Sequence, residues 1–110
     1  MITFEDFLKV EIHVGTITDV QDFPKAKKPS YQLTIDFGLP IGIKHSSAQI
    51  TVLYTKENLI GQQVIAVTNF PPRQIANFFS EVLVLGSVAD DGTVTLLQPQ
   101  QKEKNGTRIG

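Results

Sequence analysis

The stretch Tyr31-Gln32-Leu33-Thr34-Ile35-Asp36-Phe37 alternates apolar and polar side chains without interruption. Successive side chains of an extended strand point to opposite faces, so its apolar residues are expected on one face and its polar residues on the other. The sequence Gly38-Leu39-Pro40, which follows, is typical of a turn. We therefore predict a strand over 31–37 with one face buried in a hydrophobic core.

A second strand is predicted on the N-terminal side of this segment. Residues 12–20 are rich in β-branched side chains, which favour strands. The alternation slips between Val14 and Ile17, and Gly15 lies at the slip, which indicates a β-bulge or a sharp bend. Asp22-Phe23-Pro24 predicts the turn that follows this strand.

Further strands are expected along the rest of the chain. Residues 42–51 predict a strand of unusually polar content, whereas 63–70 and 81–88 are nearly continuous apolar runs. Such runs are typical of central strands that are covered on both faces. Asp90-Asp91-Gly92 predicts a tight turn that leads into a closing strand at 93–97.

Two short helices are also predicted. At the N-terminus, Thr3 caps a helix together with Asp6, and Phe4, Phe7 and Leu8 share one face of it. A helix of about two turns is not stable alone. Its apolar face must therefore pack on the rest of the chain or on another subunit.

The second helix is a single turn, with Thr55 as its N-cap and Gly61 as its stop. Five to six strands with a helical insert between the third and the fourth is the element order of an OB fold. An SH3-like barrel is the nearest competing all-β architecture, and the insert favours the OB fold over it. We expect one domain, with an N-terminal helix over 1–10, a barrel over 11–99 and a C-terminal extension over 100–110.

Composition restricts the classes of function. The chain has 110 residues, enough for one core, and a net charge of -1, which argues against binding of polyanions through bulk charge. It has no cysteine, so thiolate catalysis and cysteine-based zinc sites are excluded. The acidic start does not fit a signal peptide, and no apolar run reaches the roughly 20 residues of a membrane span. We expect a cytoplasmic protein without membrane insertion.

Enzymatic interpretations find little support in the sequence. His13 and His45 lie on different predicted strands, and no carboxylate spacing completes a metal site with either of them. Ser46 follows His45 directly, but adjacent strand residues point to opposite faces, which disfavours a nucleophile–base pair. No glycine-rich phosphate loop is present. We expect no catalytic residue, no metal and no cofactor.

A basic loop lies between the first two predicted strands. Pro24 and Pro29 bound a segment that carries Lys25, Lys27 and Lys28. A solvated loop is one explanation. The other is a contact with phosphate or with an acidic partner, because this loop borders the ligand face of OB folds.

Two further segments have the features of a binding surface. Polar side chains fill the predicted strand at 43–49, which indicates either an exposed edge strand or the wall of a groove. In residues 69–81, aromatic residues flank Arg73, a combination that suits single-stranded nucleic acid and peptides alike. A cap of Phe78 and Phe79 over the barrel end is an equal alternative.

Several segments, read together, carry a resemblance to known proteins. The first set is Ile12-His-Val-Gly-Thr-Ile, Tyr54-Thr-Lys-Glu-Asn-Leu-Ile-Gly, Val64-Ile-Ala-Val-Thr-Asn-Phe, Ser80-Glu81 and Leu96-Leu-Gln-Pro. It resembles the tRNA-binding OB-fold domain family. The second set is Ile35-Asp-Phe-Gly, Ile41-Gly-Ile-Lys-His-Ser-Ser-Ala-Gln-Ile, Asn69-Phe-Pro-Pro-Arg-Gln-Ile, Ser80-Glu-Val-Leu-Val-Leu-Gly and Asn105-Gly-Thr-Arg-Ile-Gly. Within that family, it resembles the CsaA-type chaperones.

The resemblance implies a cytoplasmic homodimer that acts as an export-related chaperone. Its expected partners are unfolded or preprotein polypeptide, the export machinery and tRNA. The implied peptide- or RNA-binding groove consists, by position, of Lys44, His45, Ser47, Gln49, Asn69, Arg73, Phe78, Ser80 and Glu81. Dimerisation is expected through Phe4, Phe7 and Leu8, whose shared face needs cover. A structure-specific RNA-binding protein without a chaperone role is the alternative, and an assembly adaptor is a third hypothesis.

Overall fold

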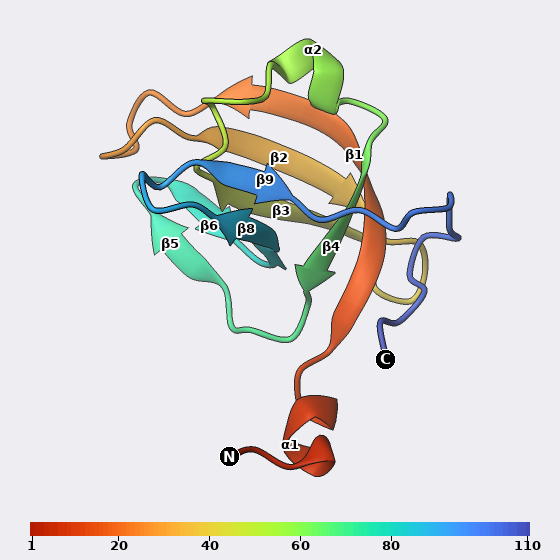
Figure 1. Ribbon diagram of the computed structural model, residues 1–110. Helices are drawn as coiled ribbons and strands as arrows, with labels where there is room; N and C mark the ends of the chain where they lie inside the picture. Colours follow the sequence, from red (N-terminus) through yellow and green to blue (C-terminus); the bar gives the residue numbers. More distant parts are fainter.

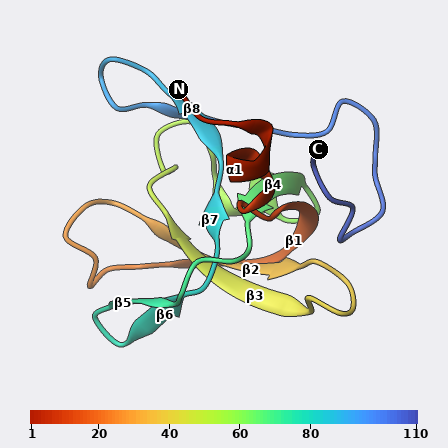
Figure 2. The same cartoon turned by 90° about the horizontal axis from the view of Figure 1, so that it is seen from below.

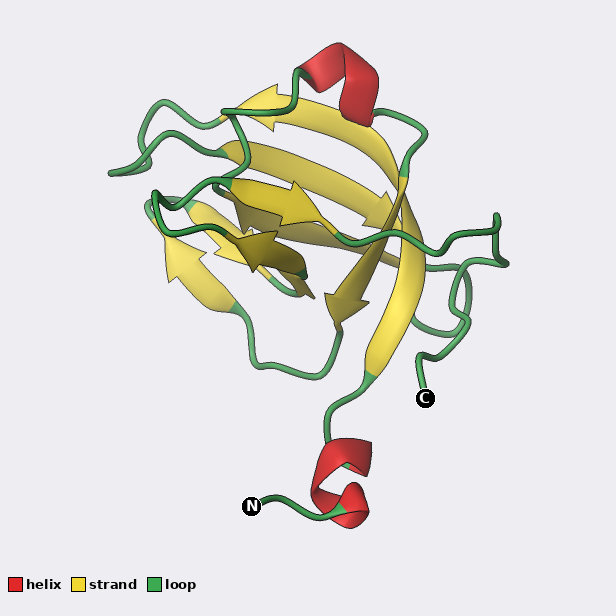
Figure 3. Cartoon of the chain, viewed as in Figure 1, coloured by secondary structure: helices red, strands yellow, loops and turns green.

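A computed structural model, which describes residues 1–110, shows strands curving around one core with two short helices (Figures 1 and 3). In chain order the elements are α1 (Phe4–Leu8), β1 (Ile12–Asp22), β2 (Tyr31–Asp36), β3 (Ile43–Ala48), α2 (Lys56–Leu59), β4 (Gln63–Val67), β5 (Arg73–Ile75), β6 (Phe78–Ser80), β7 (Leu83–Val84), β8 (Gly86–Val88) and β9 (Val94–Leu96).

The main sheet has the strand order β3-β2-β1-β4-β7, with antiparallel pairing throughout. Two hairpins, β5–β6 and β8–β9, complete the nearly closed barrel. The prediction of an all-β, OB-type barrel with an N-terminal helix and a helical turn between strands 3 and 4 is confirmed. Neither helix has the length or the apolar content to cross a membrane.

The alternation of residues 31–37 produces the core as predicted. Leu33, Ile35 and Phe37 are fully buried, and they pack with Ile17 of β1 and Val64 of β4. The intervening polar residues of β2 are half-buried on the other face. This strand therefore supplies the centre of the core from a single face.

Strand β1 serves two parts of the barrel. Its first half pairs with β4, from Ile12 to Thr16, and its second half pairs with β2, from Thr16 to Asp22. A β-carbon on Gly15 would lie 2.7 Å from Ile35 Cγ2 and 2.7 Å from the ring of Phe37. The glycine therefore lets the side chains of Ile35 and Phe37 pack directly against the backbone of β1. Strand β1 is long and curved (Figure 1).

The predicted bulge at Gly15 is wrong in position. Gly15 keeps its register with Val64, and the register between β1 and β2 shifts between Ile17 and Asp19 instead. The glycine in the sequence reflects close packing against Ile35 and Phe37. The slip in alternation arises because Val14 is buried outside the main core cluster that contains Ile17, so both faces of β1 are covered at this point.

The prediction of one buried strand over 81–88 is also wrong. Leu85 separates β7 from β8, because the chain changes partner from β4 to β9 at this point. The Leu85 N–H donates to Ile65 O at 2.8 Å, and the Leu97 N–H donates to Leu85 O at 3.1 Å. Leu83 and Val88 are exposed, which a strand covered on both faces would not allow.

The C-terminal residues form an additional layer beside β1. The Val14 N–H donates to Thr107 O at 3.0 Å, and the Ile109 N–H donates to Ile12 O at 2.8 Å. These bonds occupy the edge of β1 that β2 leaves free. Figure 2 shows this tail and the β5–β6 hairpin on opposite sides of the barrel.

We expect Gly15→Ala to destabilise the protein by about 1–3 kcal/mol, the usual cost of overpacking a core. The added methyl group would collide with Ile35 and Phe37. Urea unfolding measures the loss, and the double variant Gly15→Ala/Phe37→Leu should recover part of it because a smaller side chain leaves room. Equal stability of Gly15→Ala and the unmodified protein would contradict this account of the strand.

Candidate functional site

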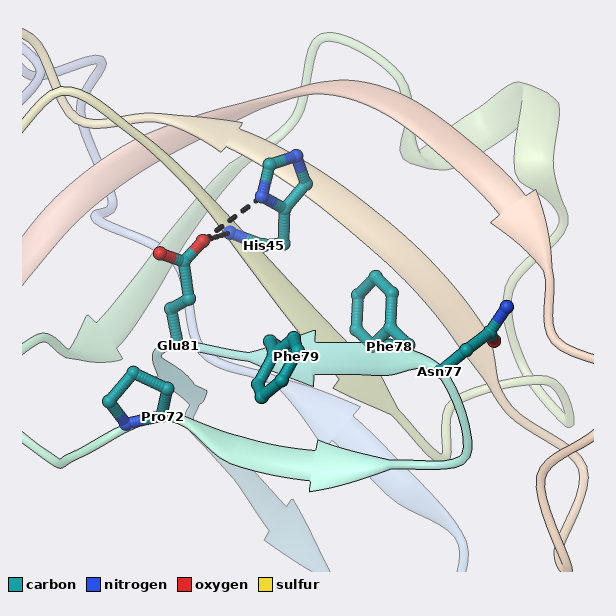
Figure 4. Close-up of a pocket in the computed structure, with 6 residues that line it drawn as sticks. All are labelled: His45, Pro72, Asn77, Phe78, Phe79 and Glu81. Atoms are coloured by element: carbon teal, nitrogen blue, oxygen red, sulfur yellow. Dashed lines mark hydrogen bonds and ion pairs between the residues drawn. The ribbon is translucent and has the colours of Figure 1, made fainter.

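An open hollow of about 590 Å³ lies between β3 and the β5–β6 hairpin. Figure 4 shows the side chains around it, which come from β3, from the loop before β5 and from the hairpin with the residue that follows it. The lining residues are His45, Pro72, Asn77, Phe78, Phe79 and Glu81. We call this hollow the hairpin pocket.

The pocket lies where β3 meets the end of the hairpin. We call this junction, formed by His45 and Ser47 with Ser80 and Glu81, the seam. The Glu81 N–H donates to His45 O at 2.7 Å, the one backbone bond of the pair. In return Glu81 Oε1 accepts from the His45 N–H at 3.0 Å, and Ser80 Oγ accepts from the Ser47 N–H at 3.0 Å. Two side chains therefore satisfy the edge of β3 where another strand would ordinarily pair.

The carboxylate of Glu81 is the centre of charge in the pocket. Its Oε1 also lies 3.0 Å from His45 Nδ1, so one oxygen meets two polar groups of the same residue. Its Oε2 has only Lys44 Nζ nearby, at 4.0 Å, beyond hydrogen-bond distance. No lysine or arginine lines the pocket.

The two phenylalanines of β6 play different parts. The Phe78 ring packs edge-on against buried Phe23 at 5.4 Å between centroids, and against the His45 ring at 6.3 Å. Phe79 follows it on the strand and is 54% exposed. Phe78 is thus a fixed wall, whereas Phe79 offers apolar surface to a ligand.

The structure brings together most of the residues predicted for the groove. His45, Phe78 and Glu81 line the hairpin pocket, and Ser47 and Ser80 form its seam. Lys44 reaches Glu81 from β3.

Three predicted residues lie outside the hairpin pocket. Gln49 is exposed beyond the end of β3, and Arg73 is exposed at the start of β5. Asn69 has a different part: its side chain accepts from the Glu11 N–H at 3.0 Å and donates to Lys9 O at 2.7 Å. It therefore ties the chain after α1 to the end of β4.

Pro72, Asn77 and Phe79 line the pocket without having been predicted for it. They belong to the same 69–81 segment, but alternation along a strand favours one of the two adjacent phenylalanines and not both. The turn between β5 and β6 accounts for Asn77: Ala76 adopts a positive φ of 54°, and the next residue, Asn77, lines the pocket. The sequence carries no signal for this turn type.

The basic loop, which carries Lys25, Lys27 and Lys28, is connected to the pocket through the contact between Phe23 and Phe78. Lys25, Lys27 and Lys28 are exposed, and none of them forms an ion pair. Phe23, at the start of this loop, is buried, and its ring contacts that of Phe78. The lysines and Glu81 are therefore separate regions of opposite charge on neighbouring surfaces.

The apolar face of α1 is largely uncovered. The helix begins with the predicted capping box of Thr3 and Asp6, and it projects from the barrel (Figure 1). Phe4 is 70% exposed, Leu8 is exposed and Phe7 is half-buried, with 6.2 Å between the Phe4 and Phe7 centroids. The same chain therefore leaves Phe4 and Leu8 uncovered and covers Phe7 only in part.

Comparison with known proteins identifies the family. A family model described as "Putative tRNA binding domain" matches residues 12–108. The chain belongs to this tRNA-binding domain family. Its structure is similar to the crystal structure of the chaperone CsaA from Bacillus anthracis, with 53% identity, a TM-score of 0.95 and coverage of 100% of this chain and 99% of the other. The CsaA chaperone protein from Picrophilus torridus is similar as well, with 56% identity, a TM-score of 0.93 and complete coverage of both chains.

The curated relatives are much longer than this tRNA-binding domain. The methionine–tRNA ligase of Porphyromonas gingivalis is 35% identical over 108 residues, which cover 98% of this chain and 15% of the ligase. The ligase of Thermococcus onnurineus is 36% identical over 109 residues, which cover 98% and 14%. The match in the ligases is therefore confined to this one domain, and the structural neighbours named above are chaperones.

His13 of this tRNA-binding domain is half-buried at the start of β1. Its Nδ1 lies 2.9 Å from Thr68 Oγ1, and the backbone bridges to Arg108. Burial lowers the pKa of His13, the positive charge of Arg108 lowers it further, and Glu11 partly opposes both. The folded protein therefore holds this imidazole neutral below the usual pKa of histidine.

We expect a decrease in stability on acidification that depends on His13. Below the unfolded pKa of about 6.5, the unfolded chain binds a proton that the native state does not, so stability falls until the lower native pKa is reached. Asn retains a polar partner for Thr68, and His13→Asn should show a flatter profile. Urea unfolding between about pH 5 and pH 7.5 measures the free energy of unfolding of the unmodified protein and of His13→Asn. An equal dependence of this free energy on pH in the two proteins would contradict the lowered pKa of His13.

Proposed function

We propose that this chain is a homodimeric chaperone that binds unfolded polypeptide at the hairpin pocket. The observation that carries the proposal is the combination of an exposed Phe79, a fixed Phe78 and a carboxylate in a hollow that no lysine or arginine lines. Unfolded polypeptide exposes apolar side chains, which such a surface can cover. Whole-length similarity at 53% and 56% identity to CsaA chaperones supports the same function.

The proposed clients are export-destined polypeptides met in the cytoplasm, with the export machinery as a further partner. tRNA is the second candidate ligand. In favour of tRNA are the family match over residues 12–108 and the three free lysines of the basic loop. The polypeptide is the better fit to the hairpin pocket, because a carboxylate repels phosphate.

The homodimer is proposed from the uncovered face of α1. Beyond Phe4, the exposed apolar residues at this end include Met1 and Ile2, at 125% and 77% of their reference areas. Asn69 and Arg108 hold the C-terminal end of the helix: the Arg108 guanidinium donates to Leu8 O at 2.8 Å. A fixed apolar helix suits a two-fold interface with a second copy.

We expect Phe79→Ala to weaken binding of an unfolded polypeptide by a factor on the order of ten or more, since burial of a Phe side chain contributes about 1.5–3 kcal/mol. Reduced and carboxymethylated α-lactalbumin, which stays unfolded, is a suitable labelled probe, and fluorescence anisotropy gives the affinity. The fold should be preserved because Phe79 is 54% exposed.

Phe70→Ala is the matched control, since Phe70 is 53% exposed and lies outside the pocket. It should bind the probe like the unmodified protein. Unchanged polypeptide affinity of Phe79→Ala, together with tRNA binding that weakens steeply with salt, would favour the RNA-binding function instead.

For the dimer, we expect Phe4→Ser to weaken self-association by a factor on the order of 100, because each of two copies loses a buried ring. Glu5→Ser, a change of the adjacent residue, is the control and should leave the dimer intact. Sedimentation equilibrium measures both. A Phe4→Ser protein that remains dimeric at the same concentrations would show that this helix is not the interface.

A further inference from the structure

We propose that the hairpin pocket binds the guanidinium group of an arginine side chain in the unfolded polypeptide. This inference rests on the proposed function and specifies the part of the ligand that the pocket selects. It is carried by the geometry of Glu81 and of the aromatic rings beside it.

Glu81 has one oxygen engaged and one open. Oε1 accepts from the backbone of His45 and lies against its ring, which holds the carboxylate in place. Oε2 has no hydrogen-bond partner, and Lys44 Nζ approaches it only to 4.0 Å. A fixed carboxylate with a free oxygen is a site for a cationic donor, and charge-assisted bonds of this kind are the stronger ones.

The rings beside the carboxylate favour a planar cation. Phe78 and Phe79 of β6 line the same pocket as Glu81, which follows this strand (Figure 4). Arginine stacks its flat guanidinium on aromatic faces and at the same time donates to a carboxylate, whereas the lysine ammonium is more strongly hydrated. The order of preference at this pocket is therefore arginine, then lysine, then neutral side chains.

Charge complementarity separates this ligand from nucleic-acid phosphate. Glu81 is the one acidic residue that lines the pocket. Lys44 does not line the pocket, although its Nζ lies 4.0 Å from Glu81 Oε2. The three lysines of the basic loop lie beyond the Phe23–Phe78 contact. An anion would bind at the lysines of that loop, whereas the carboxylate in the pocket favours a cation. A guanine base offers donors similar to those of guanidinium and is therefore a competitor to test.

The test uses two labelled, unstructured decapeptides of glycine, serine and leucine that differ at one position, arginine or its neutral isostere citrulline. On the unmodified protein, the citrulline peptide should bind on the order of ten-fold more weakly, as for loss of a hydrogen bond to a charged group. On Glu81→Gln, which keeps an acceptor for the His45 N–H, the two peptides should bind within about a factor of two of each other.

Two further variants sharpen the result. Glu57→Gln makes the same chemical change on exposed α2, far along the chain from the pocket, and should retain the full difference between the peptides. Lys44→Gln removes the cation that approaches Oε2 and should strengthen binding of the arginine peptide. The Lys44 side chain makes none of the hydrogen bonds that join β3 to the hairpin, so Lys44→Gln is informative even where Glu81→Gln fails to fold.

The outcomes are distinct. Equal affinity of the unmodified protein for both peptides overturns the arginine assignment and leaves polypeptide binding standing. An equal arginine preference in Glu81→Gln overturns the role of Glu81. Stronger displacement by guanosine than by free arginine assigns the pocket to a nucleobase. Binding of neither peptide, together with no binding of unfolded α-lactalbumin, rejects the proposed function itself.

Discussion

The close approach of β1 and β2 at Gly15 is the constraint on which the rest of the barrel depends. Because no side chain intervenes, Ile35 and Phe37 pack directly against the backbone of β1. The strand can then curve and pair with β4 on its first half and β2 on its second. The strand order leaves β3 at the sheet edge, and the end of the β5–β6 hairpin meets that edge where Glu81 bonds to His45.

Sequence reasoning was sufficient where local chemistry decides the structure. The alternation of 31–37 gave a buried face, and the capping residues Thr3 and Thr55 gave both helices, because these signals operate within a few residues. It failed at Gly15 and over 81–88, where the outcome depends on a partner strand distant in the chain. Hydrophobicity alone does not reveal that the chain exchanges β4 for β9 at Leu85.

The candidate site shows the same division. The polar strand at 43–49 and the segment 69–81 drew attention by their composition, and both contribute residues to the lining of the hairpin pocket. The positions of Asn77 and Phe79 depend on the turn at Ala76. The position of Asn69 depends on its hydrogen bond to Lys9, the residue that ends α1 and lies 60 residues earlier in the chain. Alternation cannot supply contacts of this kind, which arise only when the barrel closes.

The contact between Phe78 and Phe23 has a thermodynamic consequence. Phe78 is a wall of the hairpin pocket, and Phe23 anchors the loop that carries Lys25, Lys27 and Lys28. A ligand that displaced Phe78 would also change the packing of Phe23 and hence the loop that carries the three lysines. The two surfaces would then be linked: whatever free energy a bound chain added to or removed from anion binding at the loop, the anion would add to or remove from binding of that chain.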